Sequence, residues 1–230
     1  MANFVLVHGA WIGGWCWRLP AQALRKAGHE VFTPTMTGLG ERIHHMSPSI
    51  NLDTHIADIV NVIKCEELSD LVLVGHSYGG MVVTGVADAL PGKISSLVYL
   101  DAFVPKSGEA LVNLLPPGNP PPAFASEYTL APLPVAFFGA SPEVAAYVDA
   151  RLTPMPVGCF TQPLKLTGGI DQVKNRTYIY CNVPAPTTFT QFYDKLKDDR
   201  GWTVHTLPCT HIVQIDMPDE LTKLLLQAIA

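Results

Sequence analysis

Short apolar runs alternate with longer amphipathic stretches along most of the chain. The runs predict strands at about residues 4–7, 30–33, 71–74, 94–100, 177–181 and 203–207. The stretches between them predict helices at about residues 17–27, 52–63, 79–90, 188–197 and 218–228. Strands that alternate with helices are typical of the α/β class. We therefore expect a doubly wound, mostly parallel sheet with helices on both faces.

This alternation breaks in segment 103–170, where prolines and aromatic residues are concentrated. Its prolines include Pro116, Pro117, Pro120, Pro121 and Pro122. A linker would be polar, whereas this segment is largely apolar, so we expect a cap inserted after a strand of the sheet. The core would then comprise residues 1–102 and 171–230. The alternative is a disordered surface excursion, since long proline-rich loops can lack a single conformation.

Composition indicates one well-packed domain. The chain has 230 residues, of which 48% are hydrophobic and 15% charged, which suits a sheet buried on both faces. A net charge of −5 gives no indication of nucleic acid or an anionic membrane as a partner. We find no secretory signal and no apolar run long enough to span a bilayer, and we expect a cytoplasmic protein.

The cysteines indicate neither a disulfide framework nor a zinc site, because they are scattered and form no C-x-x-C pair. They are Cys16, Cys65, Cys159, Cys181 and Cys209. We expect most of them to be reduced core residues, and we expect no metal ion and no organic cofactor.

The strongest chemical signal is G-H-S-Y-G at residues 75–79, between a predicted strand and a predicted helix. A G-x-S-x-G turn in this place holds its serine in a strained elbow, with the hydroxyl exposed at the carboxyl edge of the sheet. Small residues flank the serine because the backbone doubles back tightly there. We therefore predict Ser77 as a nucleophile. The alternative is a glycine-rich turn with a helix-capping serine.

A serine hydroxyl needs a base to take its proton, and chain order favours His211. It follows the predicted strand at 203–207 and precedes the last predicted helix. The loop after strand 177–181 usually carries the acid of such a site, but here it holds no carboxylate. We therefore predict that Asp101, at the end of strand 94–100, orients His211, with Asp194 as the alternative.

Acyl transfer also needs two backbone N–H groups that stabilise the developing oxyanion. We predict the N–H of Tyr78, directly after the nucleophile, and the N–H of Ala10, in the loop after the first strand. Trp11 is the alternative to Ala10.

The residues predicted to bind substrate are Trp11, Cys16, Phe103, Phe137, Phe138 and Phe160. This largely aromatic set suits a flat, uncharged small molecule as the partner, while plain core packing is the alternative for each aromatic residue. Cys16 starts the helix behind the oxyanion loop, and Cys209 comes shortly before His211. Both cysteines are candidates to line the site, and a helix start would lower the pKa of Cys16.

Several motifs resemble, in content and order, the small-esterase branch of the α/β-hydrolase superfamily. They are F-V-L-V-H-G-A-W at 4–11, G-W-C-W at 14–17, T-G-L-G-E-R at 37–42, G-H-S-Y-G-G at 75–80 and Y-L-D-A-F-V-P at 99–105. The branch includes plant methyl esterases, hydroxynitrile lyases and bacterial pyrethroid hydrolases. The chain also resembles bacterial esterases that open the methyl carbamate of benzimidazole fungicides such as carbendazim.

The resemblance implies a serine esterase that hydrolyses a carboxylic or carbamic ester of a small hydrophobic or aromatic molecule through an acyl-enzyme. It supports Ser77 as nucleophile, His211 as base, and the amides of Ala10 and Tyr78 as oxyanion donors. The late acid of the family is missing, so its position does not carry over to this chain.

Two other functions are known on the same scaffold. Hydroxynitrile lyases of the family carry Thr directly after the first-loop histidine and Lys directly after the base. This chain has Gly9 and Ile212 at those positions, and an isoleucine cannot stabilise departing cyanide. A non-catalytic ligand receptor is the other alternative, because fold alone does not decide function.

Overall fold

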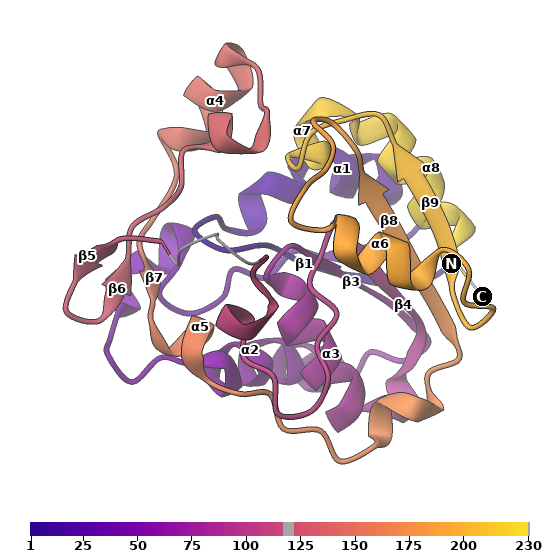
Figure 1. The fold of residues 1–230 in the computed structure, drawn as a ribbon. Coiled ribbons are helices and arrows are strands. Elements are labelled where there is room, and N and C mark those ends of the chain that lie inside the picture. The colour runs from indigo at the N-terminus through magenta and orange to yellow at the C-terminus, as the bar shows by residue number, and fades with distance from the viewer. Residues whose placement is uncertain (117–121, 230) are drawn as a thin grey trace.

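The computed structural model describes residues 1–116 and 122–229. Its central sheet has six parallel strands in the spatial order β2-β1-β3-β4-β8-β9 (Figure 1). They are β1 (Asn3–Val7), β2 (Glu30–Phe32), β3 (Leu71–His76), β4 (Ile94–Leu100), β8 (Asn175–Cys181) and β9 (Thr203–Leu207). The chain winds outward in both directions from β1 and β3, which confirms the predicted doubly wound α/β sheet.

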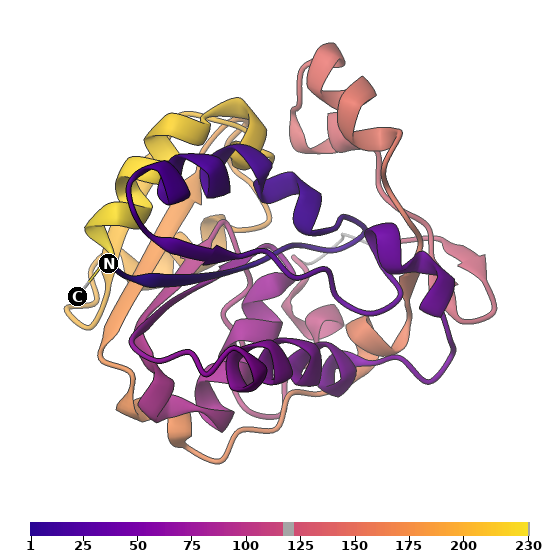
Figure 2. The ribbon, with the colours of Figure 1, turned by 180° about the vertical axis from the view of Figure 1, so that it is seen from behind.

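Helices cover both faces of this sheet. They are α1 (Arg18–Lys26), α2 (Leu52–Cys65), α3 (Gly79–Ala89), α6 (Thr190–Leu196), α7 (Val213–Asp216) and α8 (Pro218–Gln227). Figure 2 shows α1 and α8 side by side on one face, with α2 and α3 on the other. None of the helices in the described part of the chain is both long and apolar enough to cross a membrane.

Strand β1 shows why an uninterrupted apolar run is needed. Phe4 and Leu6 are buried in the cluster that includes α1 and α8, whereas Val5 and Val7 are buried in the cluster that includes α2 and α3. Successive side chains of a strand point to opposite faces, so a strand covered on both sides must be apolar at every position.

Between β4 and β8 the chain leaves the central sheet. This segment holds a three-stranded antiparallel sheet and two helices among its described residues. They are β5 (Phe124–Ser126), β6 (Thr129–Leu130), β7 (Met155–Pro156), α4 (Pro142–Asp149) and α5 (Gly158–Thr161). In Figure 1 the small sheet and α4 extend beyond the central sheet, and α5 packs against α2.

Several apolar residues of segment 103–170 pack into the core of the central sheet. Leu130, Met155 and Phe160 are buried in the cluster that includes α2 and α3. Of the prolines predicted in the cap, Pro117, Pro120 and Pro121 lie outside the described residues.

Short 3-10 helices lie in the connections. They are η1 (Gly14–Trp17), η2 (Gly40–His45), η3 (Pro91–Lys93), η4 (Leu111–Leu114), η5 (Val135–Phe138) and η6 (Gly169–Gln172).

Asp88, near the end of α3, ties the returning chain to the core. Its carboxylate accepts hydrogen bonds from the N–H (2.7 Å) and hydroxyl (2.9 Å) of Thr167, and from the N–H groups of Gly168 (3.0 Å) and Ile170 (3.1 Å). Burial raises the pKa of this carboxyl, but the hydrogen bonds outweigh burial and lower the pKa below its ordinary value. These four hydrogen bonds fix the position of the chain directly before β8.

We predict that Asp88→Ala lowers the free energy of unfolding by about 2 kcal/mol, because it leaves several donors without their charged acceptor. Urea denaturation checks this. The difference from wild type should be full above the ordinary aspartate pKa and should shrink as the pH falls through the lowered pKa. Asp171→Ala, at a side chain that is 81% exposed, is the control and should change stability by less than about 0.5 kcal/mol. Equal effects of the two substitutions would show that the hydrogen bonds of Asp88 do not stabilise the fold.

Candidate active site

A residue with a left-handed backbone follows each of three adjacent strands of the sheet. The φ angle is 63° at Trp11, after β1, 57° at Ser77, after β3, and 41° at Asp101, after β4. Such a conformation costs a non-glycine residue about 1–3 kcal/mol and is concentrated at functional sites. Because β1, β3 and β4 are parallel neighbours, their strained ends meet at one edge of the sheet.

Ser77 lies in the sharp turn between β3 and α3 that the motif predicted. Its N–H donates to the carbonyl of Leu100 (3.2 Å), and its own carbonyl accepts from the N–H of Phe103 (3.2 Å). These bonds tie the elbow to the end of β4. A glycine is needed at Gly75, because a Cβ there would lie 2.7 Å from the carbonyl oxygen of Gly79.

Asp101 and His211 are in direct contact. Oδ2 of Asp101 lies 2.6 Å from Nδ1 of His211, which is in the loop after β9, and Oδ1 accepts the N–H of Cys181 at 3.1 Å. Both side chains are buried. His211 and Ser77 together line a small cavity of about 30 Å³. The structure thus brings the predicted nucleophile, base and acid to one place.

Aromatic rings enclose the imidazole of His211. The ring of Phe189 stacks on it with 4.7 Å between centroids, and the rings of Phe138 and His76 lie at 4.9 and 4.5 Å. Nε2 of His76 also donates to the carbonyl oxygen of His211 at 2.9 Å, which fixes the loop. The ring of His211 is therefore held by packing and by the hydrogen bond at Nδ1, and Nε2 is the nitrogen left for a reacting proton.

Burial sets the protonation of this pair. It lowers the pKa of His211 to about 3, so the imidazole is neutral near pH 7 and can accept a proton. Because an oxygen of Asp101 accepts at Nδ1, the single ring hydrogen lies on Nδ1 and the lone pair on Nε2. Burial also raises the pKa of Asp101, and the hydrogen bond from Cys181 opposes that shift.

The two predicted oxyanion donors lie beside the serine. Ala10 and Tyr78 line the same cavity as Ser77. Within the described residues, the N–H groups of Ala10 and Tyr78 donate to no protein acceptor. They are free to bind an oxygen atom of a substrate.

His8 shapes the loop that carries Ala10. The N–H of Met36 donates to Nε2 of His8 at 3.0 Å, so Nδ1 carries the hydrogen and donates to the carbonyl of Gly9 at 2.8 Å. Burial lowers the pKa of His8 to about 3 and keeps it neutral. The next residue approaches the serine closely, since a Cβ on Gly9 would lie 2.9 Å from Cβ of Ser77.

A cavity of about 410 Å³ opens beside Ser77, and none of the described residues that line it carries a charged side chain. Residues predicted to bind substrate that line it are Trp11, Phe103, Phe137, Phe138 and Phe160. A second cavity, of about 390 Å³, is lined by His211 and Asp101 and shares Phe137, Phe138, Thr188 and Phe189 with the first. His211 therefore lines the second cavity, which adjoins the cavity beside Ser77 at these four shared residues.

Cys16 is the predicted pocket residue that the structure places elsewhere. Together with Cys209 it lines a separate cleft of about 910 Å³ between α1, α4 and α7. Burial raises the pKa of Cys16, so the predicted activation of this thiol is wrong. All five cysteines are free thiols, and no group of three or more His, Cys, Asp or Glu side chains in the described residues is placed to hold a metal ion.

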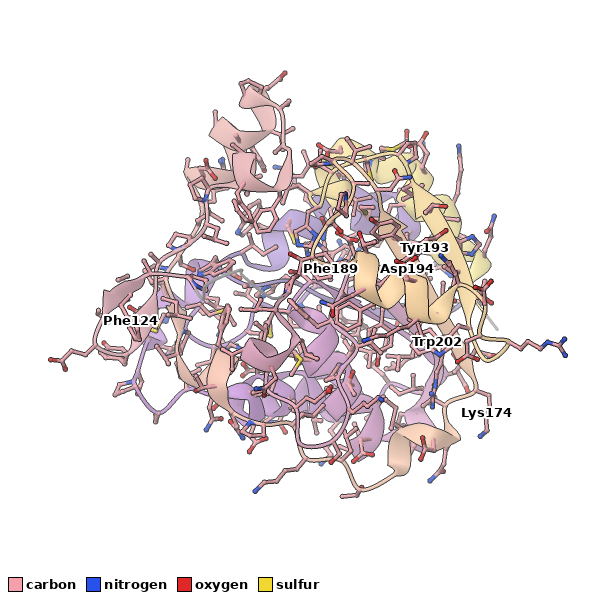
Figure 3. All side chains as sticks on the ribbon, viewed as in Figure 1. Phe124, Lys174, Phe189, Tyr193, Asp194 and Trp202 are labelled. Atoms are coloured by element: carbon pink, nitrogen blue, oxygen red, sulfur yellow. The ribbon has the colours of Figure 1, made fainter. Side chains whose placement is uncertain are left out.

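The alternative acid, Asp194, lies on α6, where Figure 3 labels it beside Tyr193. Its side chain is 55% exposed and pairs with Nζ of Lys197 at 2.7 Å. Asp216 accepts the hydroxyl of Thr210 instead. Of these carboxylates, Asp101 is the one in contact with His211.

The sequence left His55 without a role, yet the structure buries it next to the elbow. Its Nδ1 lies 3.0 Å from the hydroxyl of Tyr78. A signal was available, because His55, Ile59 and Ile63 recur at every fourth position and form the buried stripe of α2. A histidine in such a stripe needs partners for its ring nitrogens.

Comparison with known proteins supports the relationship that the site suggests. The chain matches the sequence model of the alpha/beta hydrolase family over residues 4–224. It is 47% identical, over 97% of its length, to a carbendazim hydrolyzing esterase of Nocardioides sp. (strain SG-4G), of which 98% is covered.

Solved structures share the fold at lower identity. An extracellular alpha/beta-hydrolase from a Paenibacillus species has a TM-score of 0.83 at 23% identity, with 99% of each chain covered. The methylesterase MES16 from Arabidopsis has a TM-score of 0.79 at 24% identity, with 100% of this chain and 99% of that chain covered. With the sheet, the serine elbow and the family match in agreement, this chain belongs to the alpha/beta hydrolase family.

Proposed function

We propose that this protein is a serine esterase that hydrolyses the carbamic or carboxylic ester of a small, uncharged aromatic molecule. The observation that carries the proposal is the buried 2.6 Å contact between Asp101 and His211, next to the elbow of Ser77. Three residues from three separate strand ends converge there, which is the arrangement needed to activate a serine hydroxyl.

In the proposed reaction, Oγ of Ser77 attacks the carbonyl carbon while Nε2 of His211 takes its proton. The N–H groups of Ala10 and Tyr78 stabilise the oxyanion, and Asp101 stabilises the imidazolium. The imidazolium then protonates the leaving alcohol, and the acyl group stays on Ser77. Water repeats the sequence, giving a proton to His211 and releasing the acid.

For the substrate, we propose a methyl benzimidazole carbamate such as carbendazim. The relative from Nocardioides is named for hydrolysing carbendazim, and it matches nearly the whole chain. A cavity of about 410 Å³ without charged lining residues suits a flat, neutral bicyclic ring, which would pack against aromatic faces. Attack by Ser77 on the carbamate carbonyl would release methanol and leave a carbamoyl group on the serine.

We also propose that segment 103–170 acts as the cap of the site. Most residues that line the cavity beside Ser77 belong to it, including Leu111, Leu133, Phe137, Phe138 and Phe160. A cap of this kind excludes water and so strengthens the hydrogen bonds that stabilise the oxyanion.

The lyase alternative has little support at the two positions that would distinguish it. A threonine in place of Gly9 would bring its Cβ to 2.9 Å from Cβ of Ser77, so the loop would have to shift. Ile212 is buried and supplies no charge to a departing anion. A receptor that only binds is distinguished from an esterase by the release of alcohol.

We predict that the wild type hydrolyses p-nitrophenyl acetate and a methyl benzimidazole carbamate, and that Ser77→Ala lowers kcat for both by at least about 10⁴-fold. Spectrophotometry and chromatography of the released products measure these rates. Turnover of the simple ester alone would contradict the proposed substrate. Turnover of neither compound, or full activity of Ser77→Ala, would contradict the serine esterase itself.

The acid is tested by a matched pair of substitutions. Asp101→Asn should lower kcat by about 10³- to 10⁴-fold, because an amide cannot stabilise the imidazolium or hold the correct tautomer of His211. Asp194→Asn should stay within about twofold of wild type, because Asp194 is exposed and paired with Lys197. The reverse result would transfer the role to Asp194.

A further inference from the structure

His55 of α2 is a buried histidine for which the proposed reaction has no use. Its ring lies at hydrogen-bond distance from two groups: Nδ1 is 3.0 Å from the hydroxyl of Tyr78, and Nε2 is 2.9 Å from the carbonyl oxygen of Thr37. The side chain has no exposed surface. Both ring nitrogens are thus used within the protein.

The donor and acceptor in each of these hydrogen bonds follow from the carbonyl oxygen of Thr37. A carbonyl oxygen can only accept, so Nε2 of His55 carries the hydrogen and donates to Thr37. Nδ1 is therefore the acceptor, and the hydroxyl of Tyr78 must donate to it. The tyrosine side chain has one hydrogen to give, and His55 fixes where it goes.

The side chains of His55, Tyr78 and Cys159 are all uncharged near neutral pH. Burial lowers the pKa of His55 to about 4, although the hydrogen bond to Thr37 opposes the shift. Burial raises the pKa of Tyr78 well above its ordinary value and raises that of Cys159 to about 12. The side chain of Tyr78 is therefore held by hydrogen bonds between neutral, buried groups, and such bonds are strong where water is excluded.

Segment 103–170 makes one contact with Tyr78 and one with His55. Its ring stacks on Phe160 of α5, with 6.4 Å between centroids and an interplanar angle of 3°. The neighbouring Sγ of Cys159 lies 3.6 Å from Nδ1 of His55. At the other end of these hydrogen bonds, Thr37 is held in place because its N–H and hydroxyl donate to the carboxylate of Asp58 at 2.7 and 2.8 Å.

The position of Tyr78 matters because of its backbone. Tyr78 directly follows Ser77 and is the N-cap of α3, so its N–H has no partner in the helix. That N–H is one of the two proposed oxyanion donors. An oxyanion donor has to be in place before the reaction, and a small displacement weakens it.

We propose that His55 is a positioning residue: through the hydroxyl of Tyr78 it holds the oxyanion-hole N–H in place, so that α2 and the insertion control the rate of acyl transfer. This inference rests on the proposed function. Hydrogen bonds around the buried His55, away from Ser77, would then hold the N–H of Tyr78 in place.

The test compares His55→Leu, Tyr78→Phe and the double variant with wild type on p-nitrophenyl acetate. A fluorophosphonate that reacts with the serine counts active sites, so that kcat refers to folded enzyme. We expect each single variant to lose about 10- to 100-fold in kcat with KM changed by less than about threefold. The double variant should lose no more than either single variant, because both break the same bond.

Two further variants separate positioning from stability. His55→Asn keeps an acceptor for the tyrosine hydroxyl and should recover most of the lost kcat. Tyr99→Phe is the matched control, since it removes another buried hydroxyl, which lies 2.7 Å from that of Thr84 and outside the cavity beside Ser77. It should leave kcat within about twofold of wild type.

Unchanged kcat in Tyr78→Phe, which preserves the shape of the side chain, would overturn the inference. So would additive losses in the double variant, or an equal loss in Tyr99→Phe. A wild type that hydrolyses no ester at all would instead contradict the proposed function, so the two failures are distinguishable.

Discussion

The hydrogen bond between Asp101 and His211 is the interaction on which the site depends. It joins the end of β4 to the loop after β9 across 2.6 Å, inside the protein. A carboxylate and an imidazole are both costly to bury, and they persist there because each satisfies the other. The rest of the local structure supports this pair: Cys181 donates to the second carboxylate oxygen, and His76 holds the carbonyl of His211.

Strain and close approach bring the serine to that pair. Left-handed backbone at Trp11, Ser77 and Asp101 turns the chain sharply at three neighbouring strand ends. Glycines make the approach possible, since a Cβ at Gly9 would lie 2.9 Å from Cβ of the serine. None of the described residues that line the cavity beside Ser77 is charged, and burial keeps His211 in the neutral form that can take a proton.

Sequence patterns predicted the sheet well, because a strand buried on both faces must be apolar at every position, and residues 4–7 of β1 and 71–74 of β3 are such runs. They also placed Ser77, His211 and Asp101 correctly at loops after strands, although their catalytic roles stay proposals. What the sequence could not give was side-chain direction. Cys16 is near the oxyanion loop along the chain but faces another cleft, and His55 joins Tyr78 only after α2 packs on α3. A cytoplasmic location also stays a prediction.

The proposed reaction requires Ser77 to carry a covalent intermediate. Rapid acid quenching of the enzyme during turnover of p-nitrophenyl acetate, followed by peptide mass spectrometry, tests it directly. We expect an acetyl group on the peptide that contains Ser77, located on that serine by fragmentation. An acetyl group on another residue would contradict this mechanism. So would the absence of any acylated peptide under conditions in which deacylation limits the rate of hydrolysis.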